Sequence, residues 1–348
     1  MAQAAIPEVR LLSVTHQDIA KAAGVSRGTV DRVLHNRPNV TEVTRRKVLR
    51  TAELLGYVKK GSAGENRRVT ILIPRWSDSH FNRKISSGLQ RAERQLNDES
   101  FIVKQRMLEN WTSQEMIKAI REEVAEGAQG LILRPENTTE IRSVIREVVQ
   151  SGIKVITYDA DIADCGRTCY IGQDLHLVGQ IAAGLLAKLL PPDADILIVL
   201  GNLRLEAHKG RVDGFCARLK ELGFSTSSLR IVESGEWFDL TEDLLLKELE
   251  RNGKVRAIYM ATQPISSCIA SVRKARLSQR PYIICNDLTP TAKRYLRNGE
   301  VDFVIDQAFE QESQKAVLAM YSALRSGRGV KKDVFYTDFK IITQEMVR

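Results

Sequence analysis

The sequence predicts a small all-α helix-turn-helix domain followed by a large two-lobed α/β domain, built from two parallel sheets flanked by helices. Three observations lead to this prediction. Residues 15–55 contain three short apolar patterns with helical spacing and helix-capping residues. From residue 69 onward, short apolar strands alternate with amphipathic helices. The length of 348 residues suits one small domain joined to one two-lobed domain.

The composition is that of a folded globular protein whose positive charge gathers at one end. Apolar residues make up 43% of the chain and charged residues 27%. Up to Arg68 there are 13 Lys and Arg against 6 Asp and Glu, so about +7 of the net charge of +9 lies there. This asymmetry predicts a small phosphate-binding module on a nearly neutral body. A solvated basic surface is the alternative interpretation of the charge alone.

Several other classes of protein are not expected from this sequence. It begins without the pattern of an export signal and has no apolar run near the ~20 residues of a membrane span, so we expect a cytoplasmic protein without a membrane partner. The five cysteines are scattered and form no C-x-x-C pair, so a metal site is not expected. No other cofactor is expected either. The common hydrolase and phosphate-loop motifs are absent, so we do not expect an enzyme.

The first three predicted elements are short helices. Thr15, with Asp18 three residues later, is close to a capping box at the start of the first helix. Gly24 ends this helix, and Ser26 can cap the second one after a tight turn. A third helix completes a miniature core. The predicted helices cover residues 15–23, 27–34 and 41–55.

A long segment of this region, QDIAKAAGVSRGTVDRVLHNRPNVTEVTRRKVLRTAELLGYV, resembles the DNA-binding domain of the lactose-repressor (LacI) family of transcription regulators. The match covers about 44 residues from Val14 and keeps A-G-V-S, T-V-x-R-V-L, P-N-V, T-R-x-K-V-L and L-G-Y in register. The resemblance implies a helix-turn-helix domain over residues 14–58, preceded by an extension of residues 1–13. It also implies a homodimer that binds two half-sites of operator double-stranded DNA.

The same resemblance assigns DNA contacts. Arg27 and Gly28 occupy the principal base-reading positions of the second helix, and Arg32 lies on the same face. An arginine that binds guanine through two hydrogen bonds contributes about 1–3 kcal/mol of discrimination. Hydroxyl groups in this domain match positions that the family uses on phosphates. The full predicted set is Thr15, Gln17, Ser26, Arg27, Gly28, Thr29, Asp31, Arg32 and His35.

Asp31 departs from the family pattern, which usually has Ser at this position. An anion that faces DNA weakens binding unless it is paired, and Arg27 and His35 both lie one helical turn away. We favour an ion pair in which Asp31 orients Arg27. Direct acceptance of a hydrogen bond from a cytosine amino group is the alternative.

Residues 59–68 are predicted to form a flexible, basic linker, because glycine, serine and charged residues follow one another there without an apolar period. Members of the resembled family usually have a hinge helix at this point, and its leucine wedges into the minor groove and kinks the operator. This sequence is shorter and lacks that leucine. We expect Lys59, Lys60, Arg67 and Arg68 to attract phosphates instead.

The large domain, residues 69–348, is predicted from its regular alternation of strands and helices. The strands are expected at 69–74, 101–107, 130–134, 154–159, 195–200, 229–234, 257–261, 282–287 and 302–306. The helices are expected at 80–97, 112–126, 137–151, 176–190, 206–222, 239–252, 265–276 and 309–326. In open parallel sheets, ligands bind beyond the carboxyl ends of the strands, which is where polar residues gather in this sequence.

Landmarks of this domain, among them I-T-Y-D, Y-I-G-Q-D, H-K-G-R-V-D-G-F, I-I-C-N-D and V-I-D-Q, resemble type I periplasmic sugar-binding proteins. They resemble equally the sensor domain of the same regulators. The resemblance implies an N-lobe of about residues 69–172 and 308–336, and a C-lobe of about residues 173–307 and 337–348.

The resemblance also implies a site for a small sugar-like or polyol effector between the lobes. Carboxylates and Arg side chains bind vicinal hydroxyl groups, and aromatic rings cover the apolar faces of a sugar. The predicted set is Asp78, His80, Phe81, Asp159, Arg211, Trp237, Gln263, Asp287 and Gln307. A structural role at a strand end is the alternative for each. Ala160 stands where such proteins often have Arg, which leaves the identity of the effector open.

Three functions are compatible with this organisation. A transcription regulator controlled by a sugar-like effector, most simply a repressor, accounts for both domains. A regulator controlled by a protein corepressor or a non-sugar ligand accounts for them as well. A carbohydrate-active enzyme or a transport binding protein explains only the large domain, since neither needs a DNA-reading domain. The sequence therefore favours the regulators.

The missing leucine leads to a prediction about operator shape. Without a wedge in the minor groove, bound DNA should be bent only weakly. A circular-permutation gel-shift assay measures the bend directly, and a strong kink at the operator centre would contradict this expectation.

Overall fold

The computed structural model describes residues 14–34, 37–55, 66–75, 79–235, 237–326 and 333–347. They belong to two compact units, a small one within Met1–Asn66 and a large one of Arg67–Leu324 and Gly329–Arg348. No helix in the described ranges is long and apolar enough to cross a membrane. Some predictions concern positions outside these ranges, namely the extension 1–13, most of the linker 59–68, and the site residues His35 and Asp78.

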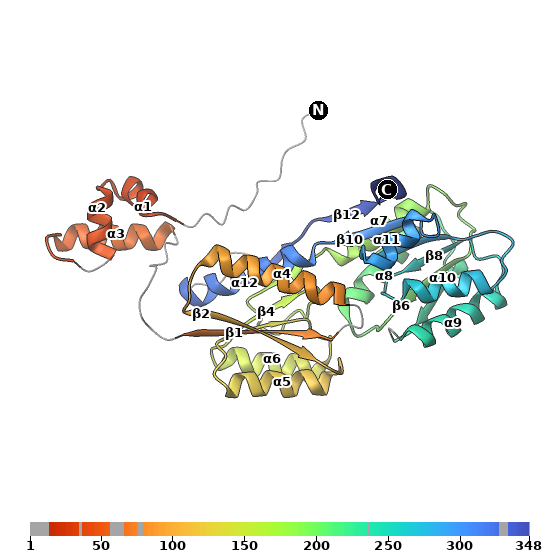
Figure 1. The fold of residues 1–348 in the computed structure, drawn as a ribbon, viewed down its shortest axis with the longest axis horizontal. Helices are drawn as coiled ribbons and strands as arrows, with labels where there is room; N and C mark the ends of the chain where they lie inside the picture. The colour runs from red at the N-terminus through yellow and green to blue at the C-terminus, as the bar shows by residue number, and fades with distance from the viewer. Residues whose placement is uncertain are drawn as a thin grey trace, which may run out of the picture. The chain divides into compact units, whose positions relative to one another are not determined.

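The small unit is the predicted helix-turn-helix. Its helices are α1 His16–Ala23, α2 Arg27–Leu34 and α3 Glu42–Leu55 (Figure 1). The Thr15 hydroxyl accepts a hydrogen bond from the Asp18 N–H, and the Asp18 carboxylate accepts one from the Thr15 N–H at 2.8 Å, which confirms the capping box. Gly24 ends α1 in the left-handed conformation, with a φ of 63°. The fully buried side chains of the core are Ile19, Val30 and Val48.

The N-lobe of the large unit is a six-stranded parallel sheet in the order β11-β5-β4-β3-β1-β2. Helices α4 and α12 pack on one face through Ile85 and Met320, and α5 and α6 cover the other face through Ile120 and Ile145 (Figure 1). Both faces are therefore buried, as a parallel sheet requires. The elements are β1 Arg67–Pro74, α4 Ser79–Leu96, β2 Phe101–Leu108, α5 Ser113–Ala125, β3 Gly130–Leu133, α6 Thr139–Gln150, β4 Lys154–Tyr158, β5 Cys169–Gly172, α12 Phe309–Ser326 and β11 Val334–Tyr336.

The C-lobe repeats this plan around a sheet in the order β12-β10-β9-β8-β6-β7. Helices α7 and α8 pack on one face through Ala182 and Phe215, and the other face carries Leu245 of α9, Ile269 of α10 and Leu296 of α11. The elements are α7 Leu175–Leu186, β6 Ile196–Leu200, α8 Glu206–Glu221, β7 Leu229–Glu233, α9 Phe238–Arg251, β8 Ala257–Met260, α10 Ile265–Lys274, β9 Tyr282–Asn286, α11 Pro290–Arg297, β10 Phe303–Gln307 and β12 Phe339–Ile342, with 3-10 turns at Thr226–Ser228 and Gln344–Val347.

Three short crossovers connect the lobes, after β5, after β10 and between β11 and β12. Thr337, in the third crossover, donates its N–H at 2.8 Å to the carbonyl oxygen of Gly172, the last residue of β5 before the first crossover. Its hydroxyl donates to the buried carboxyl group of Glu312, on the first turn of α12, also at 2.8 Å. Hydrogen bonds thus tie the crossovers to one another.

The structure corrects the predicted elements in three places. β1 begins at Arg67 rather than after the linker, because the Arg67 N–H bonds to the Ser100 carbonyl oxygen and extends the pairing with β2. β12 runs antiparallel to β10, whereas the alternation predicts only parallel strands. The chain enters β12 from the third crossover, at the end of the sheet where β10 leaves it, so β12 runs opposite to β10. β5, β11 and α11 have no counterpart among the predicted elements.

Two glycines allow α7 and α8 to pack closely. A Cβ atom on Gly179 of α7 would lie 1.9 Å from the Arg211 carbonyl oxygen of α8. A Cβ atom on Gly214 of α8 would lie 2.0 Å from the His176 carbonyl oxygen of α7. Neither position has room for a side chain, so the spacing of these helices also fixes the position of Arg211.

Gly179→Ala is therefore expected to lower the free energy of unfolding of the large unit by about 1–3 kcal/mol, because α8 must move outward. Gly184→Ala in the same helix is the matched control, since no described atom lies within 4 Å of its added Cβ. Alanine is also the better helix former by about 1 kcal/mol. Urea denaturation of the full chain compares the two variants. Equal losses in both would contradict the close packing.

Candidate ligand cavity and nucleic-acid interface

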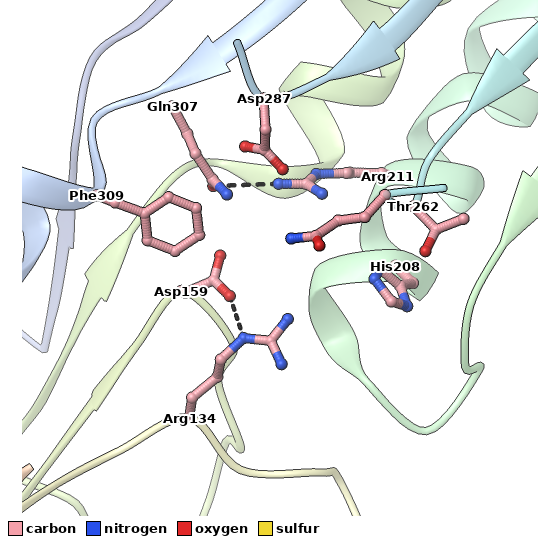
Figure 2. Close-up of a pocket in the computed structure, with 9 residues that line it drawn as sticks. Arg134, Asp159, His208, Arg211, Thr262, Asp287, Gln307 and Phe309 are labelled. Atoms are coloured by element: carbon pink, nitrogen blue, oxygen red, sulfur yellow. Dashed lines mark hydrogen bonds and ion pairs between the residues drawn. The ribbon is translucent and has the colours of Figure 1, made fainter. Parts of the chain in front are cut away.

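A polar cavity lies between the two lobes, where strands of both sheets end (Figure 2). The space inside it that the centre of a water molecule can occupy is about 10 Å³, which is room for about one water. A sugar-sized ligand therefore needs the lobes to move apart before it can bind here. The lining residues are Arg134, Asp159, His208, Arg211, Thr262, Gln263, Asp287, Gln307 and Phe309.

Two aspartates occupy equivalent places in the lobes. Asp159 directly follows β4 and Asp287 directly follows β9, and their φ angles of 58° and 70° are in the left-handed region. This conformation costs about 1–2 kcal/mol for most residues, and Asp tolerates it better than most. The Asp159 N–H donates to the Ile171 carbonyl oxygen at 3.1 Å, and the Asp287 N–H to the Ile305 carbonyl oxygen at 2.9 Å. The same turn in both lobes thus brings both side chains to the cavity.

Arg134 was not among the predicted site residues, yet it forms a buried ion pair with Asp159 (Figure 2). It directly follows β3, the neighbour of β4, so both side chains emerge at the same sheet edge. The position after Asp159, where similar sites often have Arg, is the buried Ala160. The guanidinium group beside this aspartate therefore comes from a different strand. The segment L-I-L-R contained the signal, since its Arg ends an apolar strand.

Arg211 connects the cavity to two of the crossovers. Its Nη2 atom donates to Gln173 Oε1 at 3.2 Å and to Gln307 Oε1 at 3.1 Å. Gln173 follows β5 and Gln307 ends β10, so one guanidinium group joins the first two crossovers. All three side chains are buried. The predicted site residues Arg211 and Gln307 are thus brought together.

Several buried polar atoms of the cavity have no hydrogen-bond partner within the described part of the chain. Among them are Asp159 Oδ1, Asp287 Oδ1 and Arg211 Nε. Unpaired buried polar atoms are rare and cost about 1–3 kcal/mol each. Two acceptors and one donor thus remain available to a bound molecule. A ligand with adjacent hydroxyl groups fits them, because a hydroxyl both donates and accepts.

The pKa of Asp287 is raised to about 7, mainly by burial; Arg211 opposes the shift, and the nearby Asp306 and Asp159 add to it. The positive charge of Arg211 is close, but it makes its described hydrogen bonds to the two glutamines instead. The removal of the Asp287 carboxylate from water is therefore not offset by a hydrogen bond from a cation in the described structure.

The cavity lining contains some of the predicted ligand-binding residues and lacks others. It brings together Asp159, Arg211, Gln263, Asp287 and Gln307. Phe81 is instead buried in the N-lobe core, where its ring packs edge-to-face on Phe309 at 5.3 Å between centroids. Among the described residues, Phe309 rather than Phe81 lines the cavity. His80 does not line it, and Trp237 is 72% exposed at the start of α9.

Besides Arg134, three lining residues were missed by the sequence analysis: His208, Thr262 and Phe309. His208 precedes Arg211 by three positions on α8, and this helical spacing places both on one face. Thr262 adjoins Gln263, and Phe309 follows Gln307 by two positions. Proximity to a predicted residue was therefore the available signal. Among the described residues, no cluster of three or more His, Cys, Asp or Glu side chains forms a metal site.

The second helix of the small unit presents the predicted DNA-contacting side chains at its surface. Arg27, Gly28 and Arg32 are exposed, while Val30 and Val33 are buried in the core. A Cβ atom on Gly28 would meet only Ser26 Oγ, at 3.8 Å, so the fold itself does not require glycine there. Ser26 caps α2, because its Oγ accepts from the Thr29 N–H at 3.1 Å. The predicted contacts Thr15 and Gln17 are also exposed.

The expected pair between Arg27 and Asp31 is not formed. The Asp31 carboxylate is instead bonded to Arg37 Nη1 at 3.2 Å, and it lies 4.0 Å from His16 Nδ1. The Arg37 N–H bonds to the Arg32 carbonyl oxygen at 2.8 Å, which holds Arg37 beside the end of α2 and within reach of Asp31. The negative charge of Asp31 is therefore paired with Arg37, which follows α2, and not with Arg27 on the exposed face of α2.

Two family comparisons agree with this division of the chain. Residues 15–60 match the family of bacterial regulatory proteins of the lacI family. Residues 69–329 match the periplasmic binding protein domain. The second match alone covers more than half of the chain.

Individual proteins similar to this chain fall into the same two groups. Catabolite control protein A of Priestia megaterium is 27% identical over 265 residues, which are 73% of this chain and 76% of that protein. The D-xylose-binding periplasmic protein of Escherichia coli is 30% identical over 82 residues, which are 24% of this chain and 25% of that protein. The structure of GanP, a glucose-galactose binding protein from Geobacillus stearothermophilus, matches 81% of this chain and 99% of its own, with a TM-score of 0.73 and 23% identity.

The raised pKa of Asp287 leads to a pH-dependent prediction. Folding raises this pKa from 3.8 to about 7, so the wild type loses stability as pH rises through that window. Asp287→Asn has no carboxyl group to ionise. Its free energy of unfolding, relative to the wild type, should therefore increase by up to about 4 kcal/mol between pH 4 and pH 8.

Urea denaturation of the full chain at several pH values measures this difference. Asp338→Asn, which changes an exposed carboxyl group of the same unit, serves as the control and should show no such trend. If the free energy of unfolding of Asp287→Asn relative to the wild type stays flat or decreases as pH rises, the charged Asp287 carboxylate is not buried, and the prediction is contradicted.

Proposed function

Because the chain belongs to the periplasmic binding protein domain family and its residues 15–60 match the bacterial regulatory proteins of the lacI family, we propose that it is an operator-binding transcription regulator controlled by a neutral sugar or polyol. The observation that carries the effector proposal is a pair of buried oxygen atoms, Asp159 Oδ1 and Asp287 Oδ1, one from each lobe, which have no hydrogen-bond partner among the described residues. Each can accept a hydrogen bond from one hydroxyl group of a bridging ligand.

The charges of the cavity favour an uncharged ligand. Arg134 and Arg211 face two carboxyl groups, those of Asp159 and Asp287, so the charges of the described lining residues nearly cancel when both carboxyl groups are ionised. Vicinal hydroxyl groups donate to the carboxylates and accept from the guanidinium groups, while the Phe309 ring covers apolar C–H groups. The similar proteins named for D-xylose and for glucose and galactose support the same ligand class.

The proposed control is a shift between open and closed arrangements of the lobes. A ligand that contacts Asp159 in one lobe and Asp287 in the other stabilises the closed arrangement only to the extent that it binds that arrangement better. The change reaches the DNA-binding unit through the connection at β1. We place the regulator in the cytoplasm as a homodimer, because operators with two half-sites match a two-fold symmetric protein. The family requires no catalytic activity, and we propose none.

On the DNA side, we propose that Arg27 and Arg32 read base edges, since both project from the exposed face of α2. Thr15, Gln17, Ser26 and Thr29 would contact phosphates and set the register. Asp31 would act indirectly, by fixing Arg37 beside the reading helix.

Calorimetric titration of the full chain with D-glucose, D-galactose, D-xylose and D-ribose tests the effector. At least one sugar should bind, and Asp159→Asn should weaken its binding by about 10–100-fold, through loss of a charge-assisted hydrogen bond. Asp338→Asn is the control. A gel shift with DNA selected from a random pool should then respond to the same sugar. Binding of DNA without a response to any of these sugars would favour a different effector.

A further inference from the structure

The lobes also touch outside the cavity lining, at a contact centred on Glu136. Glu136 follows β3 in the N-lobe and is 4% exposed. Its Oε1 atom accepts a hydrogen bond from Asn202 Nδ2 of the C-lobe at 2.7 Å, and its Oε2 atom accepts one from Ser113 Oγ of its own lobe at 2.7 Å. Beside this contact, the Asn137 N–H donates to the Arg204 carbonyl oxygen across the lobes at 2.7 Å.

Asn202 is connected to the cavity as well. Its backbone N–H donates to Nδ1 of His208, a cavity-lining residue, at 3.1 Å. Its Oδ1 atom accepts from the Arg204 N–H at 2.8 Å. The N–H, the side-chain oxygen and the side-chain nitrogen of Asn202 therefore all have partners. One residue links a ring in the ligand cavity to a carboxylate of the opposite lobe.

We propose that Asn202 and Glu136 form an interlobe clasp, and that His208 couples this clasp to the effector; the proposal rests on the proposed function of the cavity. Closing the lobes removes the Glu136 carboxylate from water, which is costly unless hydrogen-bond donors replace the water. Ser113 supplies one donor in either arrangement, but Asn202 supplies the other only when the lobes meet in this register. Asn202 and Glu136 are thus positioning residues for closure.

The coupling follows from the tautomer of His208. Because Nδ1 accepts a hydrogen bond, the neutral ring carries its proton on Nε2. An effector that packs against this ring in the cavity would hold the imidazole in place, and with it the backbone of Asn202. Ligand contact and lobe contact would then reinforce each other.

A donor–acceptor exchange tests the clasp. Asn202→Asp replaces the donor with a second carboxylate against Glu136, and it should weaken sugar binding by about tenfold or more through like-charge repulsion. The double variant Glu136→Gln and Asn202→Asp restores one donor and one acceptor, so binding should return to within about threefold of the wild type. Titration with D-glucose, D-galactose, D-xylose and D-ribose provides the affinities.

Asn252→Asp is the matched control. Asn252 Nδ2 donates to Asp195 Oδ2 at 3.1 Å within the C-lobe, so the variant creates the same contact between carboxylates away from Glu136. Its sugar affinity should stay within about threefold of the wild type. If Asn202→Asp weakens binding no more than Asn252→Asp does, or if the double variant fails to recover, the clasp is overturned.

A second readout does not depend on sugar binding. The amide hydrogen of Asn137, bonded across the lobes, should exchange slowly in the wild type and the double variant and faster in Asn202→Asp. His208→Ala should also speed exchange at Asn202. Slow exchange without binding of any sugar would support the clasp and count against the proposed effector. Fast exchange at Asn137 in the wild type, with and without sugar, would overturn the clasp itself.

Discussion

The buried guanidinium group of Arg211 is the constraint on which most of the large unit depends. A charge removed from water needs hydrogen-bond partners, and Arg211 takes them from Gln173 and Gln307, one on each of two crossovers. Its backbone lies where α8 presses against α7, at a distance that only glycine at positions 179 and 214 permits. Helix spacing, crossover geometry and cavity shape are therefore set together. A change in any one of them displaces the other two.

The cavity combines satisfied and unsatisfied polar groups. The ion pair between Arg134 and Asp159 fixes one wall, while Asp159 Oδ1 and Asp287 Oδ1 have no partner in the described structure. These unpaired atoms lower the free energy of unfolding of the ligand-free protein, and a ligand that donates hydrogen bonds to them removes this penalty. This free energy favours a ligand that reaches both lobes at once. The contact between Glu136 and Asn202 adds a requirement that the lobes meet in one register.

The small unit separates its structural tasks from its surface tasks by helix face. Val30 and Val33 of α2 pack into the core, while Arg27, Gly28 and Arg32 lie on the exposed side. Gly28 is not needed for the fold, so close approach of another molecule is a better reason for its presence. The carboxylate of Asp31 is paired with Arg37, so the exposed face of α2 that carries Arg27 and Arg32 keeps its positive charge.

Local patterns alone determined the three helices of the small unit, the capping box of Thr15, most strands of the large unit, and the strand-end positions of Asp159 and Asp287. These features depend on apolar period and capping chemistry, which act over a few residues and can be recognised in a single sequence. The tertiary structure decided the rest. It placed Arg134 beside Asp159 and brought Phe309, not Phe81, to the cavity. It also paired Asp31 with Arg37 instead of Arg27 and made β12 antiparallel to β10. Each of these outcomes depends on how segments distant in sequence, or joined by an irregular turn, pack against one another, and no local period records that packing.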